Sequence, residues 1–365
     1  MEKRLRSFNK CREIIDALKE NEHNQVCTPI QISAIHKNSS RVLICKNALV
    51  SKQYGVHHAS GHPFHGTVLT RGKYGENNVT FPRGNPQKIT SIAEHKQINT
   101  IKIAFYIQYL QFDNFGHLLT ETISNIFPLI YWKKKQSDLF KIPIIINEKE
   151  SQKQAKKLAH LLEIDPSQIL TPDSAHQSFC VESLLTAAPS HVNRCFVSKN
   201  HAKWVKKFLQ LQLRSRYFNN HSDRKIDKLY ISRSKLSPTS RTFAQEAELE
   251  NQLRNHGWEI YHPEEYTIQK QLIVYQSVKK ICALEGSAIH LLFGANIKNI
   301  ENFILLCRKD ENNFAKQLRA QAINYKTISA FENAPWCTKS STLRDIRLKP
   351  HITLNQLVDL IEAGN

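Results

Sequence analysis

The sequence lacks the long apolar run that a membrane-spanning helix needs: no segment of its 365 residues is long and apolar enough to cross a bilayer. The N-terminal stretch, MEKRLRSFNKCREIIDALKE, also lacks the apolar centre of a signal peptide. Its charged, periodic pattern instead predicts a helix within the first forty residues. We therefore expect a cytoplasmic protein that can associate peripherally with the inner face of the membrane.

Paired cysteines are also missing, because the eight cysteines form no C-x-x-C pair and show no zinc-site spacing. This pattern argues against a zinc-ribbon or disulfide-stapled domain. Several of the cysteines lie in apolar, strand-like runs, so we expect buried free thiols. The eight are Cys11, Cys27, Cys45, Cys180, Cys195, Cys282, Cys307 and Cys337.

Acidic residues are too few to balance the basic ones: 51 Lys and Arg stand against 32 Asp and Glu, a net charge of +19. Such an excess attracts nucleic acid, anionic membrane surfaces or phosphorylated substrates. The charge is spread along the chain, and no zinc finger, RNA-recognition signature or arginine-rich arm accompanies it. The charge therefore indicates a general attraction to anionic surfaces and no specific partnership with nucleic acid.

The chain contains no internal repeat or low-complexity segment, and its length suits two domains, each with its own core. Strands and helices alternate with short turns over residues 228–329, which predicts a parallel sheet covered on both faces. We expect an α/β fold with an N-terminal domain (1–218), a second domain (219–340) and a C-terminal segment with a closing helix (341–365). Ligands of such folds usually bind in the cleft between the domains.

The periodicity of apolar residues places each expected element along the chain. Predicted helices cover residues 115–132, 151–162, 198–217, 243–256, 267–278, 287–293, 312–323 and 354–362. Predicted strands cover residues 41–50, 66–69, 101–109, 142–147, a short piece near 169, then 179–186, 228–232, 258–261, 280–284, 299–306 and 325–329.

The most informative stretch is residues 113–121, where an imidazole and a carboxylate lie four residues apart at the start of an apolar helix. His117 and Glu121 share one helix face, one turn apart, and such a pair can transfer protons at neutral pH. Asp113 or Asn114 is a natural N-cap. Taken alone, the spacing favours a core histidine hydrogen-bonded to its helix neighbour over a catalytic pair.

A cationic loop follows the strand at 228–232: Arg233 and Lys235 come first, then a turn, then Arg241. Ligands of parallel sheets lie beyond the carboxyl ends of the strands, where Arg233 falls. Two guanidiniums and a lysine facing the start of the next helix suit a diphosphate. The alternative is a solvated loop, and the position directly after a buried strand favours the diphosphate site.

The strand at 280–284 ends in Glu285-Gly286-Ser287, and His290 follows in the next helix. Glycine and small residues at this switch allow a ligand to approach the backbone N–H groups of the helix start. Glu285 could accept hydrogen bonds from sugar or ribose hydroxyls, and His290 could reach the same pocket. Any tight turn between a strand and a helix can need such residues, so this motif is weak by itself.

In order, the three motifs read N-x-x-H-x-x-x-(D/E), then R-x-(6–8)-R-x-x-x-(N/Q)-E, then G-(A/S)-x-(L/I)-(N/H)-x-x-F, and together they resemble glycosyltransferase family 61 over about residues 100–310. The resemblance implies a GT-B fold, with two Rossmann-like domains facing each other across a cleft, and inverting transfer from a nucleotide sugar. It implies that residues 1–218 form the acceptor-side domain and residues 219–340 the nucleotide-sugar-binding domain. Bacterial members of the family serve capsular polysaccharide biosynthesis. The matching residues are Asn114, His117, Glu121, Arg233, Arg241, Gln245, Glu246, Gly286, Ser287, Ile289, His290 and Phe293.

Three positions depart from the family pattern, and they bear on the identity of the donor. Glu285 stands where many members have histidine, Ser287 where alanine is usual, and Gln245 where asparagine is common. The first hundred residues match no known pattern, and we expect the acceptor site there.

Inverting transfer needs a base for the acceptor hydroxyl and positive charge for the departing nucleoside diphosphate. We assign the base to the pair, with His117 as proton acceptor and Glu121 as its orienter narrowly favoured over the reverse. Arg233 and Arg241 would hold the diphosphate with help from Lys235. The nucleotide or donor sugar would be lined by Glu285, Gly286, Ser287 and His290, with Asn114 and Glu246 as supporting residues.

The chain has no D-x-D motif, the usual carboxylate clamp for a divalent ion beside a sugar nucleotide. We therefore expect a metal-independent enzyme without a cofactor, whose substrates are a nucleotide sugar and a glycan or lipid-linked glycan acceptor. A histidine-rich segment containing His57, His58, His62 and His65 could bind a metal, but its interleaved glycines favour an irregular loop near the acceptor.

Two other functions remain open from the sequence alone. One is a non-catalytic basic protein that binds nucleic acid or an anionic glycan, which would show steep salt dependence. The other is a phosphotransferase acting on anionic sugars with the same arginines.

Overall fold

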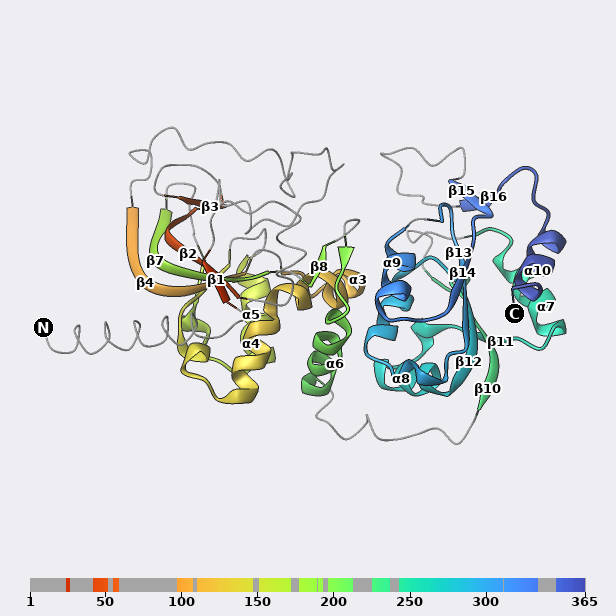
Figure 1. Cartoon of the computed structure of the whole chain (residues 1–365), viewed down its shortest axis with the longest axis horizontal. Helices are drawn as coiled ribbons and strands as arrows, with labels where there is room; N and C mark the ends of the chain where they lie inside the picture. The colour runs from red at the N-terminus through yellow and green to blue at the C-terminus, as the bar shows by residue number, and fades with distance from the viewer. Residues whose placement is uncertain are drawn as a thin grey trace, which may run out of the picture. The chain divides into compact units, whose positions relative to one another are not determined.

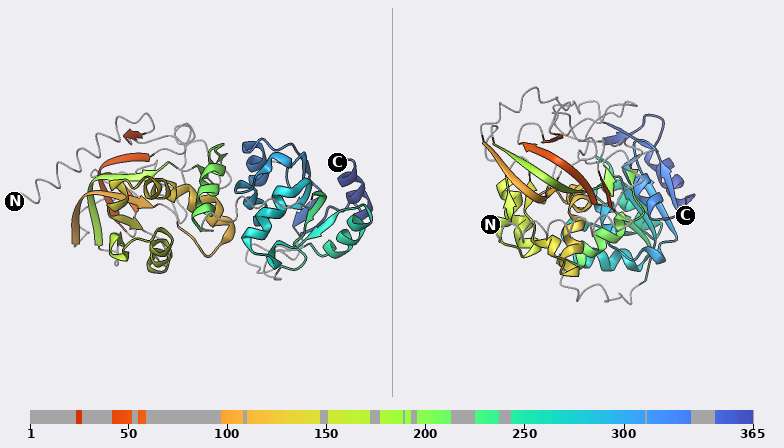
Figure 2. Two further views of the ribbon diagram at one scale, coloured as in Figure 1. Left: turned by 90° about the horizontal axis from the view of Figure 1, so that it is seen from below. Right: turned by 60° about the vertical axis from the view of Figure 1, so that its left-hand side comes forward.

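Two compact units, Met1–Trp204 (unit 1) and Val205–Asn365 (unit 2), make up the computed structural model (Figures 1 and 2). The predicted boundaries near residues 218 and 340 fall outside the described residues and stay predictions. The structure describes residues 24–26, 42–51, 55–58, 97–107, 110–146, 151–171, 177–188, 190–192, 196–212, 225–236, 243–310, 312–333 and 346–364.

Unit 1 is built on a mostly parallel sheet with the strand order β1-β2-β7-β4-β5-β6, and β3 pairs with the outer part of β2. Strand β7 lies between β2 and β4, parallel to β4 and antiparallel to β2 (Figure 1). The strands are β1 (Asn24–Val26), β2 (Val42–Ser51), β3 (Gly55–His58), β4 (Gln97–Ile107), β5 (Ile144–Ile146), β6 (Ile169–Leu170) and β7 (Gln177–Ala187), with the small hairpin β8 (His191–Val192) and β9 (Phe196–Val197).

The predicted helix at 115–132 is divided into three segments. It begins as α3 (Phe115–His117), widens into a π turn, η3 (Leu118–Thr122), and continues as α4 (Ile123–Lys135). The prediction of one regular α-helix was therefore wrong at this point, because periodicity reports which residues are apolar and does not detect one added residue in a turn. The expectation that this helix is mostly buried is confirmed, since Ile123, Ile126 and Leu129 are fully buried.

Aromatic contacts fix α4 within unit 1. The Trp132 ring meets Phe105 of β4 edge-on at 5.4 Å, and Phe127 stacks on Trp204 at 4.6 Å. Aromatic pairs in these geometries contribute beyond the area they bury. The other helices of this region are α5 (Ser151–Leu162) and α6 (His201–Gln212), with short 3₁₀ turns η4 (Asp138–Lys141) and η5 (Pro166–Gln168).

Unit 2 is an entirely parallel five-stranded sheet with the order β11-β10-β12-β13-β14, as the alternating pattern predicted. In Figure 1, α8 and α9 lie on one side of this sheet and α7 and α10 on the other. Its strands are β10 (Ile226–Ile231), β11 (Glu259–Tyr261), β12 (Val278–Leu284), β13 (Asn302–Leu306) and β14 (Tyr325–Ile328). Its helices are α7 (Glu246–Asn255), η6 (Pro263–Glu265), α8 (Ile268–Ser277), η7 (Ser287–Phe293), η8 (Ile297–Asn299), α9 (Asn313–Ala320) and α10 (Leu354–Glu362), and the hairpin of β15 (Phe331–Asn333) and β16 (Ile346–Leu348) follows β14.

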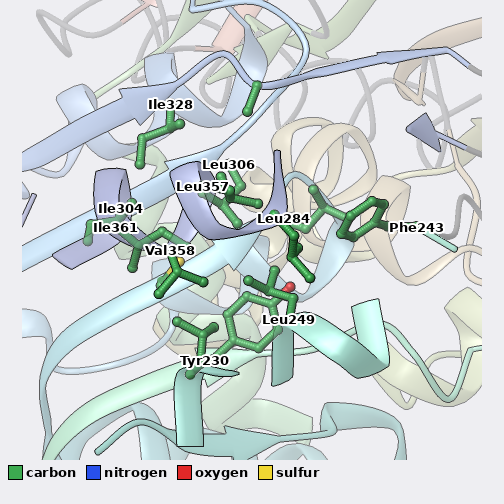
Figure 3. Close-up of a cluster of buried hydrophobic side chains, with 14 of the residues drawn as sticks. Tyr230, Phe243, Leu249, Leu284, Ile304, Leu306, Ile328, Leu357, Val358 and Ile361 are labelled. Carbon is green, nitrogen blue, oxygen red and sulfur yellow. The ribbon is translucent and has the colours of Figure 1, made fainter. Parts of the chain in front are cut away.

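A buried apolar core joins this sheet to α7 and α10. Side chains of alternate strand residues, such as Tyr230 and Ile304, pack with Leu249 of α7 and with Leu357 and Ile361 of α10 (Figure 3). The predicted closing helix is confirmed, and Thr353 with Gln356 forms a capping box at its start.

The strand order of unit 2 places a topological switch between β10 and β12. From β10 the chain moves first to β11 on one side and then crosses back to β12 on the other side. In open α/β sheets, ligands bind at the carboxyl ends of the strands at such a switch point. A ligand site is therefore expected just beyond Ile231 and Leu284, the last residues of these two strands.

Some of the other predicted features lie outside the described residues, and the structure confirms or corrects the rest. The strand at 66–69, the first helix, and His62 and His65 lie outside the described residues. His57 and His58 lie in strand β3, so the irregular loop predicted for the histidine-rich segment was wrong at these two residues, because pairing with β2 extends the chain there. Residues 287–293 form a 3₁₀ helix instead of an α-helix. Four cysteines lie in the described ranges, all as free thiols: Cys45, Cys282 and Cys307 are buried and Cys180 is partly exposed. No helix in the described part of the chain combines the length and apolar character that crossing a bilayer takes.

Candidate active site

Asn114 is the N-cap of the segment that carries the predicted catalytic pair. Its side-chain oxygen accepts a hydrogen bond from the backbone N–H of His117 at 3.1 Å, which satisfies one exposed donor of the helix start. The neighbouring Asp113 has a different role, because it forms ion pairs with Lys157 and Lys153 of α5. Hydrogen bonds from these two lysines lower the pKa of Asp113 to about 2. The helix start is therefore tied to α5 and held in a fixed orientation.

His117 and Glu121 form a direct pair, with 2.5 Å between the histidine Nδ1 and the glutamate Oε2. The Glu121 side chain is buried, whereas 23% of the His117 side chain is exposed. Because a carboxylate can only accept, Nδ1 carries the proton and the Nε2 atom carries the lone pair. The Thr120 hydroxyl lies 3.0 Å from the same Oε2 atom. A buried carboxylate that orients a more exposed imidazole is an arrangement suited to proton abstraction.

In unit 2, Arg233 and Gly286 meet at the switch point. Each lies two residues beyond the end of its strand, β10 and β12 respectively. A Cβ atom added to Gly286 would lie 1.8 Å from Nη1 of Arg233, so the guanidinium occupies the space that any other side chain would fill. The backbone of Gly286 is extended (φ −176°), so glycine serves here to provide room. The structure thus brings together two residues predicted for the donor site.

The other residues predicted for this site have specific partners. Lys235 forms an ion pair with Glu265 at 2.6 Å on the surface, and Ser287 is exposed at the start of η7. The hydrogen bond to Glu265 raises the pKa of Lys235. Arg241 lies outside the described residues, so its predicted contact with the diphosphate stays a prediction.

Glu285 is buried and pairs with Arg308, whose Nε donates to the carboxylate at 2.5 Å. A second nitrogen of Arg308 donates to Asn333 at 2.6 Å. No sequence motif singled out Arg308, although it follows β13 by two residues, as Arg233 follows β10. A search for cations two residues beyond each predicted strand would have found it.

His290 is nearly buried in η7 and is held from two sides. Its ring stacks on Phe314 at 5.0 Å, and its Nδ1 lies 2.7 Å from Oε1 of Gln317. The Gln317 amide nitrogen donates to the Ile289 carbonyl at 2.8 Å, so the amide oxygen faces the histidine and Nδ1 is the donor. Any contact of His290 with a donor substrate would therefore be made through Nε2.

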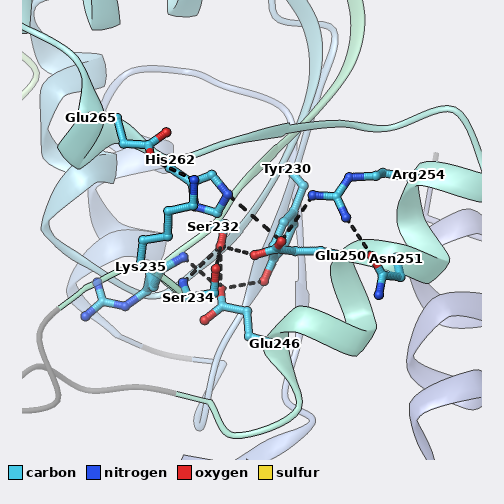
Figure 4. A network of polar contacts seen from close by, with 11 residues as sticks. Tyr230, Ser232, Ser234, Lys235, Glu246, Glu250, Asn251, Arg254, His262 and Glu265 are labelled. Carbon is cyan, nitrogen blue, oxygen red and sulfur yellow. Dashed lines mark hydrogen bonds and ion pairs between the residues drawn. The ribbon is translucent and has the colours of Figure 1, made fainter.

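Two buried carboxylates, Glu246 and Glu250, accept hydrogen bonds from the strand end and loop around Arg233 (Figure 4). Oε1 of Glu246 accepts hydrogen bonds from the backbone N–H of Arg233 at 2.8 Å and from the Tyr230 hydroxyl at 3.0 Å. Glu250 accepts the Ser232 hydroxyl at 2.6 Å. These bonds fix the backbone from which the guanidinium extends, and the supporting role in donor binding that the sequence predicted for Glu246 stays a prediction.

Burial also changes the ionisation of this cluster. It raises the pKa of Glu246 to about 7 and lowers the pKa of Arg233 from its ordinary value. Oε2 of Glu246 is buried and has no hydrogen-bond partner among the described residues. A carboxyl group whose pKa is raised on folding binds its proton more tightly in the folded state, so it lowers stability when it ionises.

The free energy of unfolding should therefore decrease between about pH 4.5 and pH 7 through Glu246, by about 3 kcal/mol for the shift from 4.5 to about 7. Glu246→Gln removes this titration, and the amide oxygen can keep the bonds to Arg233 and Tyr230. Urea unfolding at pH 5, 6, 7 and 8 should show a flatter profile for the variant than for the wild type. Parallel profiles would show that Glu246 does not titrate in this range.

The fold is α/β with two mainly parallel sheets, and these residues form a candidate ligand site at the carboxyl edge of the sheet of unit 2. Comparison with known families agrees: the model of the family Glycosyltransferase 61 matches residues 115–298, half of the chain. The chain belongs to glycosyltransferase family 61. It is therefore a glycosyltransferase, which requires a sugar donor and an acceptor, and the matched range includes His117, Glu121, Arg233 and Gly286. No curated protein matches the chain.

Proposed function

We propose that this glycosyltransferase is an inverting enzyme that moves a sugar from a nucleotide-sugar donor to a glycan or lipid-linked glycan acceptor in capsule or other surface polysaccharide synthesis. The observation that carries the proposal is the Arg233 guanidinium lying over Gly286 at the switch point of unit 2. A fixed cation beside a glycine at the carboxyl edge of a parallel sheet is suited to bind a diphosphate.

The donor side stabilises the leaving group. Arg233 donates hydrogen bonds to the diphosphate and offsets the negative charge that develops as the bond between the anomeric carbon and the phosphate oxygen breaks. Arg241 and Lys235 add positive charge, while Ser287 and His290 line the donor. The Glu246 carboxylate holds the Arg233 backbone at 2.8 Å, so the guanidinium is positioned before the donor arrives.

The acceptor side supplies the base. His117 takes the proton of the acceptor hydroxyl at Nε2 while the hydroxyl oxygen forms a bond to the anomeric carbon. The buried Glu121 carboxylate, 2.5 Å from Nδ1, stabilises the imidazolium that results. The nucleoside diphosphate leaves with the electron pair of the broken bond, and a single displacement inverts the anomeric configuration.

Donor binding gives a direct test. We expect one of UDP-, GDP- or TDP-sugars to raise the Tm of the purified protein, because a ligand at 100 times its Kd stabilises the folded state by about 2.7 kcal/mol. Inorganic sulfate at the same ionic strength is the control for charge alone. An equal rise with sulfate and with every nucleotide sugar would contradict a specific donor site. NMR of the product formed from the binding donor should then show the inverted anomer.

A further inference from the structure

Glu121 lies in the π turn η3, and His117 is the residue directly before that turn. A π turn is an uncommon form of helix that is usually confined to a single turn. In a π turn the backbone hydrogen bonds span five residues, as from the N–H of Ile123 to the carbonyl of Leu118. The bonding pattern of neighbouring carbonyls then departs from that of a regular α-helix. A widened turn of this kind needs contacts outside the helix to hold it.

His201, the first residue of α6, makes such a contact. Its side chain is fully buried, and its Nε2 lies 2.9 Å from the carbonyl oxygen of Leu119, at the centre of the stretch from His117 to Glu121. A carbonyl can only accept, so Nε2 carries the proton. Nδ1 then accepts a hydrogen bond from the fully buried Ser190 hydroxyl at 2.8 Å, which fixes the ring orientation.

A second set of hydrogen bonds joins His191, which follows Ser190 in the chain, to Ser124 at the start of α4. The Ser124 hydroxyl lies 2.9 Å from the backbone N and 3.1 Å from the backbone O of His191. The Ser190 carbonyl accepts a hydrogen bond from the N–H of Ser198 at 2.8 Å, and the Ser198 carbonyl accepts one from the N–H of His201 at 2.9 Å. These two bonds link Ser190 to the start of α6. Ser190, His191 and His201 therefore brace the π turn through its backbone and through Ser124, the second residue of α4.

We propose that His201 is a positioning residue for catalysis, which holds the π turn so that the His117 imidazole stays in register with the Glu121 carboxylate. The inference rests on the proposed role of this pair as the base. Without the bond to Leu119, the turn can tighten toward a regular helix, and the angle between His117 and Glu121 changes. Displacement of a catalytic group by about 1 Å can reduce the rate by about 100-fold.

The test compares His201→Leu with His201→Gln in a steady-state transfer assay. The leucine variant loses the donor to Leu119, and we expect kcat to fall by about 10- to 100-fold while the donor KM and the donor-induced rise in Tm stay within about 2-fold of wild type. The glutamine variant has an amide N–H that can reach the same carbonyl, and it should recover most of the lost kcat. His160→Leu, at an exposed histidine of α5, is the matched control and should leave kcat unchanged.

The following outcomes decide the proposal. Unchanged kcat in His201→Leu overturns it, as does a loss of kcat that only follows the loss of folded protein measured by circular dichroism. If His201→Leu does not fold, Ser190→Ala, which removes only the bond that orients the ring, should still lower kcat by about 3- to 10-fold without altering the donor KM. His117→Ala in the same assay separates the base from its positioning: full activity there would overturn the proposed base itself, whereas a loss there with none in His201→Leu overturns only the positioning role.

Discussion

Replacing His117 with alanine is expected to lower kcat by about 10²- to 10⁴-fold, the range that general base catalysis contributes. The Tm should change little, because the imidazole is partly exposed and its 2.5 Å bond to Glu121 joins residues four apart in the chain. Donor affinity should be retained, since the residues proposed to bind the donor belong to unit 2. Steady-state kinetics with the donor identified by thermal shift, together with a Tm measurement on each variant, checks this result.

Glu121→Gln tests the other half of the pair. The amide keeps the size of the side chain but cannot stabilise an imidazolium, so kcat should fall with Tm near that of the wild type. An equal or larger loss than in His117→Ala would favour Glu121 as the proton acceptor, the reverse of our assignment. The exposed His160 provides the control, and His160→Ala should behave as wild type. Full activity in both His117→Ala and Glu121→Gln would refute the assignment of the base.

Gly286→Ala should weaken donor binding by about 10- to 100-fold, which is the effect of one or two charge-assisted hydrogen bonds. The new Cβ would lie 1.8 Å from Nη1 of Arg233, an atom at the end of a flexible side chain. The guanidinium should therefore move away while the surrounding fold stays intact. Isothermal titration with the nucleoside diphosphate measures the change in Kd without relying on turnover.

A double-mutant cycle separates displacement of the guanidinium from other effects of the new methyl group. Arg233→Ala alone should lose a similar amount of affinity, and adding Gly286→Ala to it should cause little further loss, because both changes remove one interaction. Gly364→Ala, just beyond the end of α10, is the control for an added methyl group away from Arg233; its Cβ would lie 3.3 Å from the Leu360 carbonyl oxygen, a close contact that a shift of a few tenths of an ångström relieves. Strictly additive losses in the cycle would show that Gly286 acts independently of Arg233.

Arg308 offers a cation at the neighbouring strand end that no sequence motif singled out. Its pairing with the buried Glu285 at 2.5 Å also gives that carboxylate a structural partner, beside the contact with sugar hydroxyls predicted for it. The parallel position of Arg233 and Arg308 after β10 and β13 follows from the regular strand spacing of unit 2.

The sequence by itself determined the features that depend on near neighbours in the chain. The βα units of unit 2 were predicted because each strand and helix shows its own hydrophobic period and the connections are short. The contact between His117 and Glu121 was also predicted, because residues four apart meet on one face of a helix. The sequence offered Asp113 or Asn114 as the N-cap, and the structure shows that it is Asn114. The same holds for the helices at 151–162 and 354–362.

Only the tertiary structure decided the features that join distant segments. Three such features have no local signature in the sequence. They are the position of β7 between β2 and β4, the contact of the Arg233 guanidinium with Gly286, and the hydrogen bond between His201 and Leu119, 82 residues earlier in the chain. Such contacts form because separate elements pack around a shared core, and local propensity contains no information on which elements those are. The π turn shows this most clearly, since an isolated helix of that sequence would be regular and the widened form depends on partners that folding brings to it.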